Sequence, residues 1–108
     1  MFKNVNVQQA LELVKRGVVV VDVREPAEWA RGHLPGARLV SLSTLRASPE
    51  EHLPKRKVLF VCAAGVRSAI AARLAAEIGV TEIYNLVGGT TAWANAGHPI
   101  TAELDVAV

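Results

Sequence analysis

The chain has a single cysteine, few aromatic residues and no long apolar run. One cysteine among 108 residues excludes an internal disulfide, and a lone thiol is easiest to keep reduced in the cytoplasm. The longest β-branched run, Val18–Val21, is far too short to span a bilayer. No apolar stretch follows the first residues as it would in a signal peptide. We therefore expect a cytoplasmic protein that is not bound to a membrane.

An excess of charge of one sign is also missing. The chain has 12 Lys and Arg against 10 Asp and Glu, a net charge of +2. Its densest basic cluster, Lys55–Lys57, has no interleaved aromatic residues, so nucleic acid is not an expected partner. No His, Asp or Glu is spaced with the cysteine like a metal ligand, and we expect neither a metal nor another cofactor. Composition and length predict one domain, 1–108, with its core at about 5–99 and a short tail after 100.

Apolar, β-branched runs alternate with helical segments along the chain. Strands are expected at 18–23, 38–41, 57–61 and 81–86. Helices are expected at 7–16, where Asn6 could be the N-cap, and at 25–30, 67–78 and 88–97. The polar segment 43–53 should be irregular or weakly helical. This alternation predicts an α/β fold with a mostly parallel sheet, in which functional loops gather at the carboxyl ends of the strands.

The cysteine, Cys62, lies where an apolar strand ends and an Ala-rich helix begins. The short loop between them has Gly65 at its centre and Arg67 near its end. A strand, a tight loop and a helix in this order aim backbone N–H groups at one point, at the positive end of the helix dipole. A thiolate is stabilised there, so we predict that Cys62 is a nucleophile rather than a packed structural thiol. The N–H groups expected to hold its anionic substrate are those of Ala63, Ala64, Gly65, Val66, Arg67 and Ser68.

Other residues near this loop have expected roles of their own. Gly65 should supply a left-handed backbone or a close approach. Arg67 opposes the helix dipole, so it should act as a fork for an anionic substrate or as a brace for the loop. Ser68 is either a helix cap or a hydrogen-bond donor to the sulfur, and both interpretations stay open. Asp22 and Arg24, at the end of another strand, are expected to form a structural ion pair or to support the loop.

Three motifs together resemble the rhodanese-like domain of the single-domain sulfurtransferase type. They are Asp22–Glu25 with Glu28–Trp29 and Gly32–Ala37; the loop Cys62–Ser68; and Leu86–Gly89 followed by Ala92–Trp93 and Gly97–Pro99. The resemblance implies a central parallel sheet with helices on both faces and a loop cysteine that carries sulfur as a persulfide. It thus predicts a thiosulfate sulfurtransferase, with a small anionic sulfur donor and a thiol, cyanide or protein thiol as acceptor.

Two other functions compete with this prediction. The domain could be a persulfide carrier or an interaction module that serves a protein partner, and nothing in the loop excludes it. A cysteine-based phosphatase or arsenate reductase is also built on a cysteine loop that closes on an arginine. That pattern is Cys-x5-Arg, whereas Cys62 and Arg67 form the shorter Cys-x4-Arg, whose smaller ring suits attack on sulfur.

Overall fold

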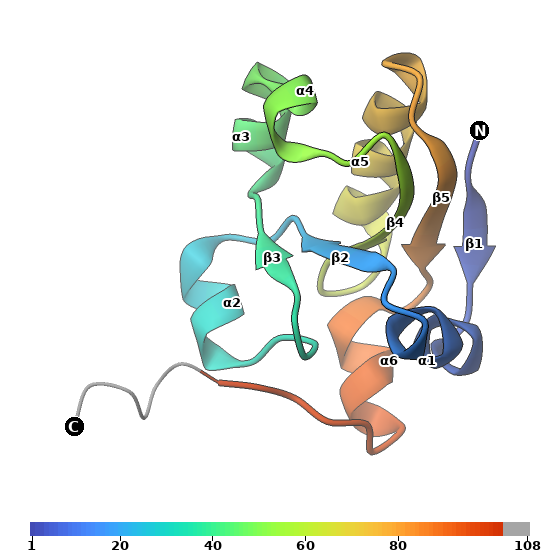
Figure 1. Cartoon of the computed structure of the whole chain (residues 1–108). Coiled ribbons are helices and arrows are strands. Elements are labelled where there is room, and N and C mark those ends of the chain that lie inside the picture. The colour runs from blue at the N-terminus through green and yellow to red at the C-terminus, as the bar shows by residue number, and fades with distance from the viewer. Residues whose placement is uncertain (103–108) are drawn as a thin grey trace.

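A five-stranded parallel sheet forms the centre of the protein in the computed structural model, which describes residues 1–102 (Figure 1). The strand order is β1-β5-β4-β2-β3, and each neighbouring pair is parallel. The strands are β1 (Lys3–Val5), β2 (Val19–Asp22), β3 (Arg38–Leu39), β4 (Arg56–Val61) and β5 (Thr81–Leu86). Strand β4 therefore lies in the middle, and its carboxyl end is flanked by those of β5 and β2.

Helices cover both faces of the sheet, as predicted. They are α1 (Val7–Lys15), α2 (Pro26–Arg31), α3 (Leu42–Ala47), α4 (Pro49–His52), α5 (Val66–Glu77) and α6 (Gly89–Asn95). Because side chains alternate along a strand, Val58 and Phe60 of β4 pack with α3 and α5, whereas Leu59 and Val61 pack with α1 and α6. No helix within residues 1–102 is long and apolar enough to cross a membrane.

The first helix begins where the sequence indicates. The Asn6 side chain accepts a hydrogen bond from the Gln9 N–H at 2.8 Å, and the Gln9 side chain accepts one from the Asn6 N–H at 2.9 Å. This reciprocal capping box satisfies two N–H groups that would otherwise lack a helical partner. After α1, Gly17 adopts a left-handed φ of 81°, which turns the chain toward β2.

The structure departs from the predicted elements in a few places. Strand β1 was not predicted; it pairs with β5, with Asn4 beside Asn85. The predicted strand 38–41 is ordered as a strand only over β3, whereas the segment 43–53 is weakly helical as expected and contains most of the short helix α3 and all of α4. In the predicted tail, Thr101 pairs with His33 through two backbone hydrogen bonds of 2.8 and 2.9 Å. The rest of the predicted tail, residues 103–108, lies outside the described residues.

Candidate active site

Cys62 directly follows β4, at the carboxyl edge of the sheet, and its loop leads into α5. Its side chain is buried, at 1% exposure. The Gly65 N–H donates a hydrogen bond to Cys62 Sγ at 3.1 Å, and Ser68 Oγ lies 3.3 Å from the same sulfur. The sulfur is therefore enclosed by its own loop and by the first turn of α5.

The charge state of this thiol is set by opposing effects. Burial raises the pKa of the Cys62 thiol, whereas hydrogen bonds from the Ser68 side chain and from the backbone N–H groups of Ser68, Ala64 and Gly65 lower it. The lowering effects win, so the pKa lies below its ordinary value. The cradle of N–H groups thus favours the thiolate, the nucleophilic form of cysteine.

The amino-terminal end of α6 fixes the backbone of the cysteine loop. The Thr90 N–H donates to the Cys62 carbonyl at 2.8 Å, and the Thr91 N–H donates to the Ala63 carbonyl at 3.2 Å. Gly89 makes this approach achievable, because a Cβ at that position would lie 2.2 Å from the Cys62 carbonyl oxygen. These bonds point the two loop carbonyls toward α6.

Gly65 has the backbone shape that the sequence analysis expected. Its φ is 98°, in the left-handed region, and it is the N-cap of α5. A Cβ there would lie 3.1 Å from the Leu86 carbonyl oxygen and 3.2 Å from the Gly88 nitrogen. The loop therefore turns tightly against the segment that follows β5.

The Arg67 guanidinium is engaged by a carboxylate that the sequence analysis did not assign. Its two terminal nitrogens donate to the two Glu28 carboxylate oxygens at 2.9 and 3.0 Å. This hydrogen bond is the largest cause that lowers the pKa of Glu28 to about 2, and the Glu25 N–H, which donates to the same carboxylate at 2.9 Å, adds to it. In turn, Glu28 raises the pKa of Arg67. Of the two roles considered for Arg67, this geometry is that of a brace, which ties the start of α5 to α2.

Asp22 and Arg24 form a buried, bidentate ion pair. The Arg24 Nε and a terminal nitrogen donate to the Asp22 carboxylate at 2.8 to 3.1 Å, and the Arg24 N–H donates to it at 3.0 Å. Arg24 also donates to the Gly32 carbonyl at 2.7 Å. The pair therefore supports the chain around α2, which carries Glu28, rather than facing the sulfur with a free charge.

Ser68 lies inside α5 and makes no capping hydrogen bond, and its hydroxyl oxygen lies 3.3 Å from the Cys62 sulfur. Its hydroxyl donates to Asn85 Oδ1 at 2.5 Å. Asn85 is a buried residue of β5 that the sequence analysis did not single out. No pattern in the sequence marks it, because β5 also contains Thr81, Glu82 and Tyr84.

No cluster of three potential metal ligands occurs among His, Cys, Asp and Glu of residues 1–102. His33, which the motifs contain, bonds through Nδ1 to the Trp29 carbonyl at 2.8 Å and stacks on the Trp29 ring, with centroids 3.9 Å apart. This histidine is thus engaged with α2 and its following turn.

An open groove of about 370 Å³ lies beside the cysteine loop. It is lined by Arg24, Glu28, Arg31, Gly32, Ala63, Thr90, Thr91, Ala94 and Ile100. Because Ala63 and Glu28 are both in its wall, the groove offers an approach to the loop from the space between α2 and α6.

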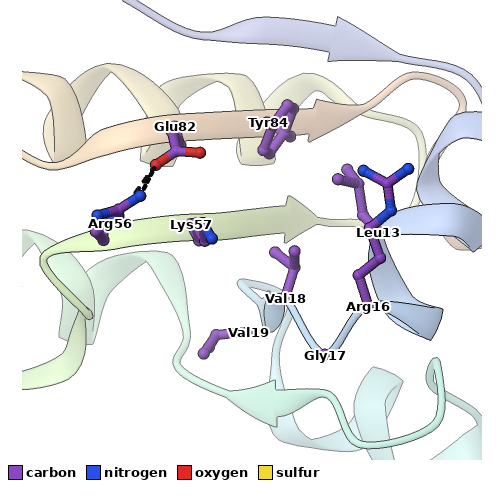
Figure 2. Close-up of a pocket in the computed structure, with 9 residues that line it drawn as sticks. All are labelled: Leu13, Arg16, Gly17, Val18, Val19, Arg56, Lys57, Glu82 and Tyr84. Carbon is purple, nitrogen blue, oxygen red and sulfur yellow. Dashed lines mark hydrogen bonds and ion pairs between the residues drawn. The ribbon is translucent and has the colours of Figure 1, made fainter.

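A second pocket, of about 270 Å³, lies at the opposite end of the sheet (Figure 2). It is lined by Leu13, Arg16, Gly17, Val18, Val19, Arg56, Lys57, Glu82 and Tyr84. Lys57 and Glu82 there have left-handed φ angles of 64° and 55°, where the ladder between β4 and β5 is interrupted. Since these residues are at the amino ends of the strands, this pocket is separate from Cys62.

Comparisons with known proteins agree with this architecture. Residues 6–96 match the family model of the rhodanese-like domain. A thiosulfate sulfurtransferase GlpE from Pseudoalteromonas translucida is 34% identical over 93 residues, 85% of this chain and 89% of the relative. A rhodanese-related protein from Thermoplasma volcanium has a TM-score of 0.80 at 29% identity, over 92% of this chain and 97% of that one. A Rhodopseudomonas palustris protein described as a "possible tyrosine phosphatase" has a TM-score of 0.81 at 32% identity, over 93% and 85% of the two chains. The chain therefore belongs to the family of rhodanese-like domains.

Proposed function

We propose that this protein is a sulfurtransferase that works through a persulfide on Cys62. The Cys62 thiolate attacks the outer sulfur of thiosulfate, an S–S bond forms, and sulfite leaves with the electrons of the broken S–S bond. A thiol, a protein thiol or cyanide then attacks the outer sulfur of the persulfide. With cyanide the products are thiocyanate and the Cys62 thiolate, so atoms and charge balance without a metal or another cofactor.

The observation that carries this proposal is the enclosure of Cys62 Sγ by N–H groups at the start of α5. The Gly65 N–H already lies 3.1 Å from the sulfur, and the pKa of the thiol is lowered. The same ring of N–H groups, from Ala63 to Ser68, would hold the outer sulfur of the persulfide as an anion. The GlpE relative, which is named a thiosulfate sulfurtransferase, supports the same chemistry. A reduced, reactive thiol also fits a cytoplasmic location.

Loop length argues against phosphatase chemistry, although one similar structure carries that description. From Cys62 to Arg67 the loop has six residues, one fewer than a phosphatase loop. In addition, the Arg67 guanidinium is bound by Glu28, whereas a phosphatase needs its arginine fork for the phosphate. We therefore expect no substantial hydrolysis of an aryl phosphate.

A second candidate function is a persulfide carrier that hands sulfur to a protein thiol. Its support is a pair of exposed apolar side chains at the cysteine loop. Val66 is 70% exposed, and Val87, whose Cα is close to Gly65, is 51% exposed. Exposed valines next to a reactive sulfur favour contact with another protein over contact with small ions.

Steady-state assays of the wild type and of Cys62→Ser test the proposed function. Thiocyanate formation from thiosulfate and cyanide should be fast in the wild type and absent in the variant. Slow thiocyanate formation with rapid transfer of sulfur to a protein thiol would favour the carrier instead. Aryl phosphate hydrolysis that is faster than sulfur transfer, or turnover by Cys62→Ser, would overturn the proposal.

A further inference from the structure

A chain of polar side chains leads from the cysteine into the sheet. Ser68 Oγ lies 3.3 Å from Cys62 Sγ and bonds to Asn85 Oδ1 at 2.5 Å. The Asn85 amide nitrogen donates to the Asn4 side chain at 3.0 Å and to the Gly65 carbonyl at 3.3 Å. Cys62, Ser68 and Asn85 are all buried, at 1%, 0% and 3% exposure. Asn85 is thus linked both to the cysteine loop and, through Ser68, to the sulfur.

The direction of each hydrogen bond in this chain follows from its chemistry. A backbone carbonyl can only accept, so the Asn85 atom beside the Gly65 carbonyl must be the amide nitrogen. The amide oxygen of Asn85 therefore faces Ser68, and the serine hydroxyl must donate to it. A hydroxyl has a single hydrogen. In this arrangement Ser68 can therefore meet Cys62 only as an acceptor, from a neutral S–H group.

A thiolate reverses this requirement, because it has no hydrogen and can only accept. We propose that Asn85 is a positioning residue of the site. Its amide oxygen accepts the hydrogen bond of the Ser68 hydroxyl while Cys62 is a thiol. When the thiolate forms, the Ser68 hydroxyl turns and donates its hydrogen bond to the sulfur instead. The inference rests on the proposed function, since only a cysteine that reacts needs both states. Asn85 then opposes the thiolate, and Ser68 stabilises it once the hydroxyl has turned.

Charged groups near the sulfur remain in place when Asn85 is changed. They are Arg67 on α5, Glu28 on α2, Asp22 at the end of β2 and Arg24 just beyond it. Helix α6, which packs on the loop, has no charged residue. If removing the Asn85 amide changes the thiolate population only when Ser68 is present, the change is therefore attributable to the Ser68 hydrogen.

The test is the rate of iodoacetamide alkylation of Cys62, measured well below the pKa of the thiol. Asn85→Leu keeps the approximate volume of the side chain and removes the acceptor, so Ser68 is free to donate to the thiolate. The rate should rise about tenfold, as for one hydrogen bond to a charged group. Ser68→Ala alone should lower the rate. In the Ser68→Ala background, Asn85→Leu should change the rate less than about twofold.

A purely structural role of Asn85 would give a different result. It predicts that Asn85→Leu changes the alkylation rate equally with and without Ser68, or that Asn85→Leu lowers the rate. Either outcome overturns the inference. If Asn85→Leu does not fold, Asn85→Asp replaces it. Its carboxylate holds the Ser68 hydrogen more firmly, so the rate should fall, and it should fall less in the Ser68→Ala background. Equal falls in both backgrounds would overturn the inference.

Alkylation needs no sulfur donor, so this experiment and the test of sulfur transfer fail separately. Asn4→Ala serves as the control within the network. It removes the partner of the Asn85 amide nitrogen but leaves the bond between Ser68 and Asn85 Oδ1. The alkylation rate of Asn4→Ala should stay within about twofold of the wild type, whereas a change as large as that of Asn85→Leu contradicts the assigned role.

Discussion

Replacing Glu28 by Gln tests the ion pair that ties α2 to the cysteine loop. Gln keeps the size of the side chain and one acceptor for Arg67 but removes the charge. The pKa of Glu28 falls from 4.5 to about 2 in the folded protein. Taken in full, that difference corresponds to about 3 kcal/mol, of which the hydrogen bond from the Glu25 N–H supplies a part and the pair with Arg67 the rest. Because the side chains of Arg67 and Glu28 are 36% and 32% exposed, solvent screens the pair, and we expect Glu28→Gln to cost about 1 kcal/mol at pH 7.

The dependence of this cost on pH has a definite sign. Since the folded pKa of Glu28 is depressed, its contribution to stability is present above about pH 4.5 and is lost as the pH falls toward about 2. The glutamine side chain of the variant has no charge to lose. The difference in unfolding free energy between the wild type and Glu28→Gln should therefore shrink below pH 4.5.

Urea unfolding of both proteins at a series of pH values from neutral to acidic measures this difference. Glu12→Gln is the matched control, because Glu12 faces Lys15 at 4.0 Å with both side chains more than half exposed. It should cost little at any pH. A cost of Glu28→Gln that is the same across the pH range, or no cost at pH 7, would refute this account of the pair.

Two further predictions concern the loop itself. Gly89→Ala should destabilise the protein by about 2 kcal/mol or more and lower sulfur transfer, because its Cβ would collide with the Cys62 carbonyl; Gly97→Ala, which meets nothing within 4 Å, should cost only about 1 kcal/mol and keep the activity. Arg67→Ala should raise the pKa of Cys62, and Arg67→Lys should raise it less, because an ammonium keeps the charge but not the planar fork. His33→Gln should leave the pKa of Cys62 nearly unchanged. The pH dependence of iodoacetamide alkylation measures all three. These expectations would be contradicted if Gly89→Ala were as active and stable as Gly97→Ala, or if His33→Gln changed the pKa of Cys62 more than Arg67→Ala did.

The sequence was sufficient to predict the general architecture and the position of the cysteine. Buried parallel strands are nearly continuous apolar runs, so β2 and the apolar second half of β4 were visible in the pattern. Cys62 and Asp22 end such runs, which located them at one edge of the sheet. Strand β1 has three residues, and two of them are exposed, so no periodicity could reveal it. It is ordered through its pairing with the edge of β5.

The partners of the predicted site residues could not be read from the sequence. Glu28 and Arg67 are 39 positions apart, and Ser68 and Asn85 are 17 apart. Which of several carboxylates meets Arg67 depends on how α2 is oriented, and that orientation depends on the buried pair of Asp22 and Arg24. The sequence therefore left two roles open for Arg67, and the geometry of the fold favours the brace.

The central claim, that Cys62 carries sulfur as a persulfide, is tested most directly by the mass of the intact protein. Reduced wild type is incubated with thiosulfate, polysulfide or glutathione persulfide, and excess donor is removed before mass spectrometry. At least one donor should add a single sulfur atom, about 32 Da, which cyanide then removes. Cys62→Ser should show no addition with any donor. An adduct on Cys62→Ser, or an unmodified wild type with all three donors, would contradict the persulfide mechanism.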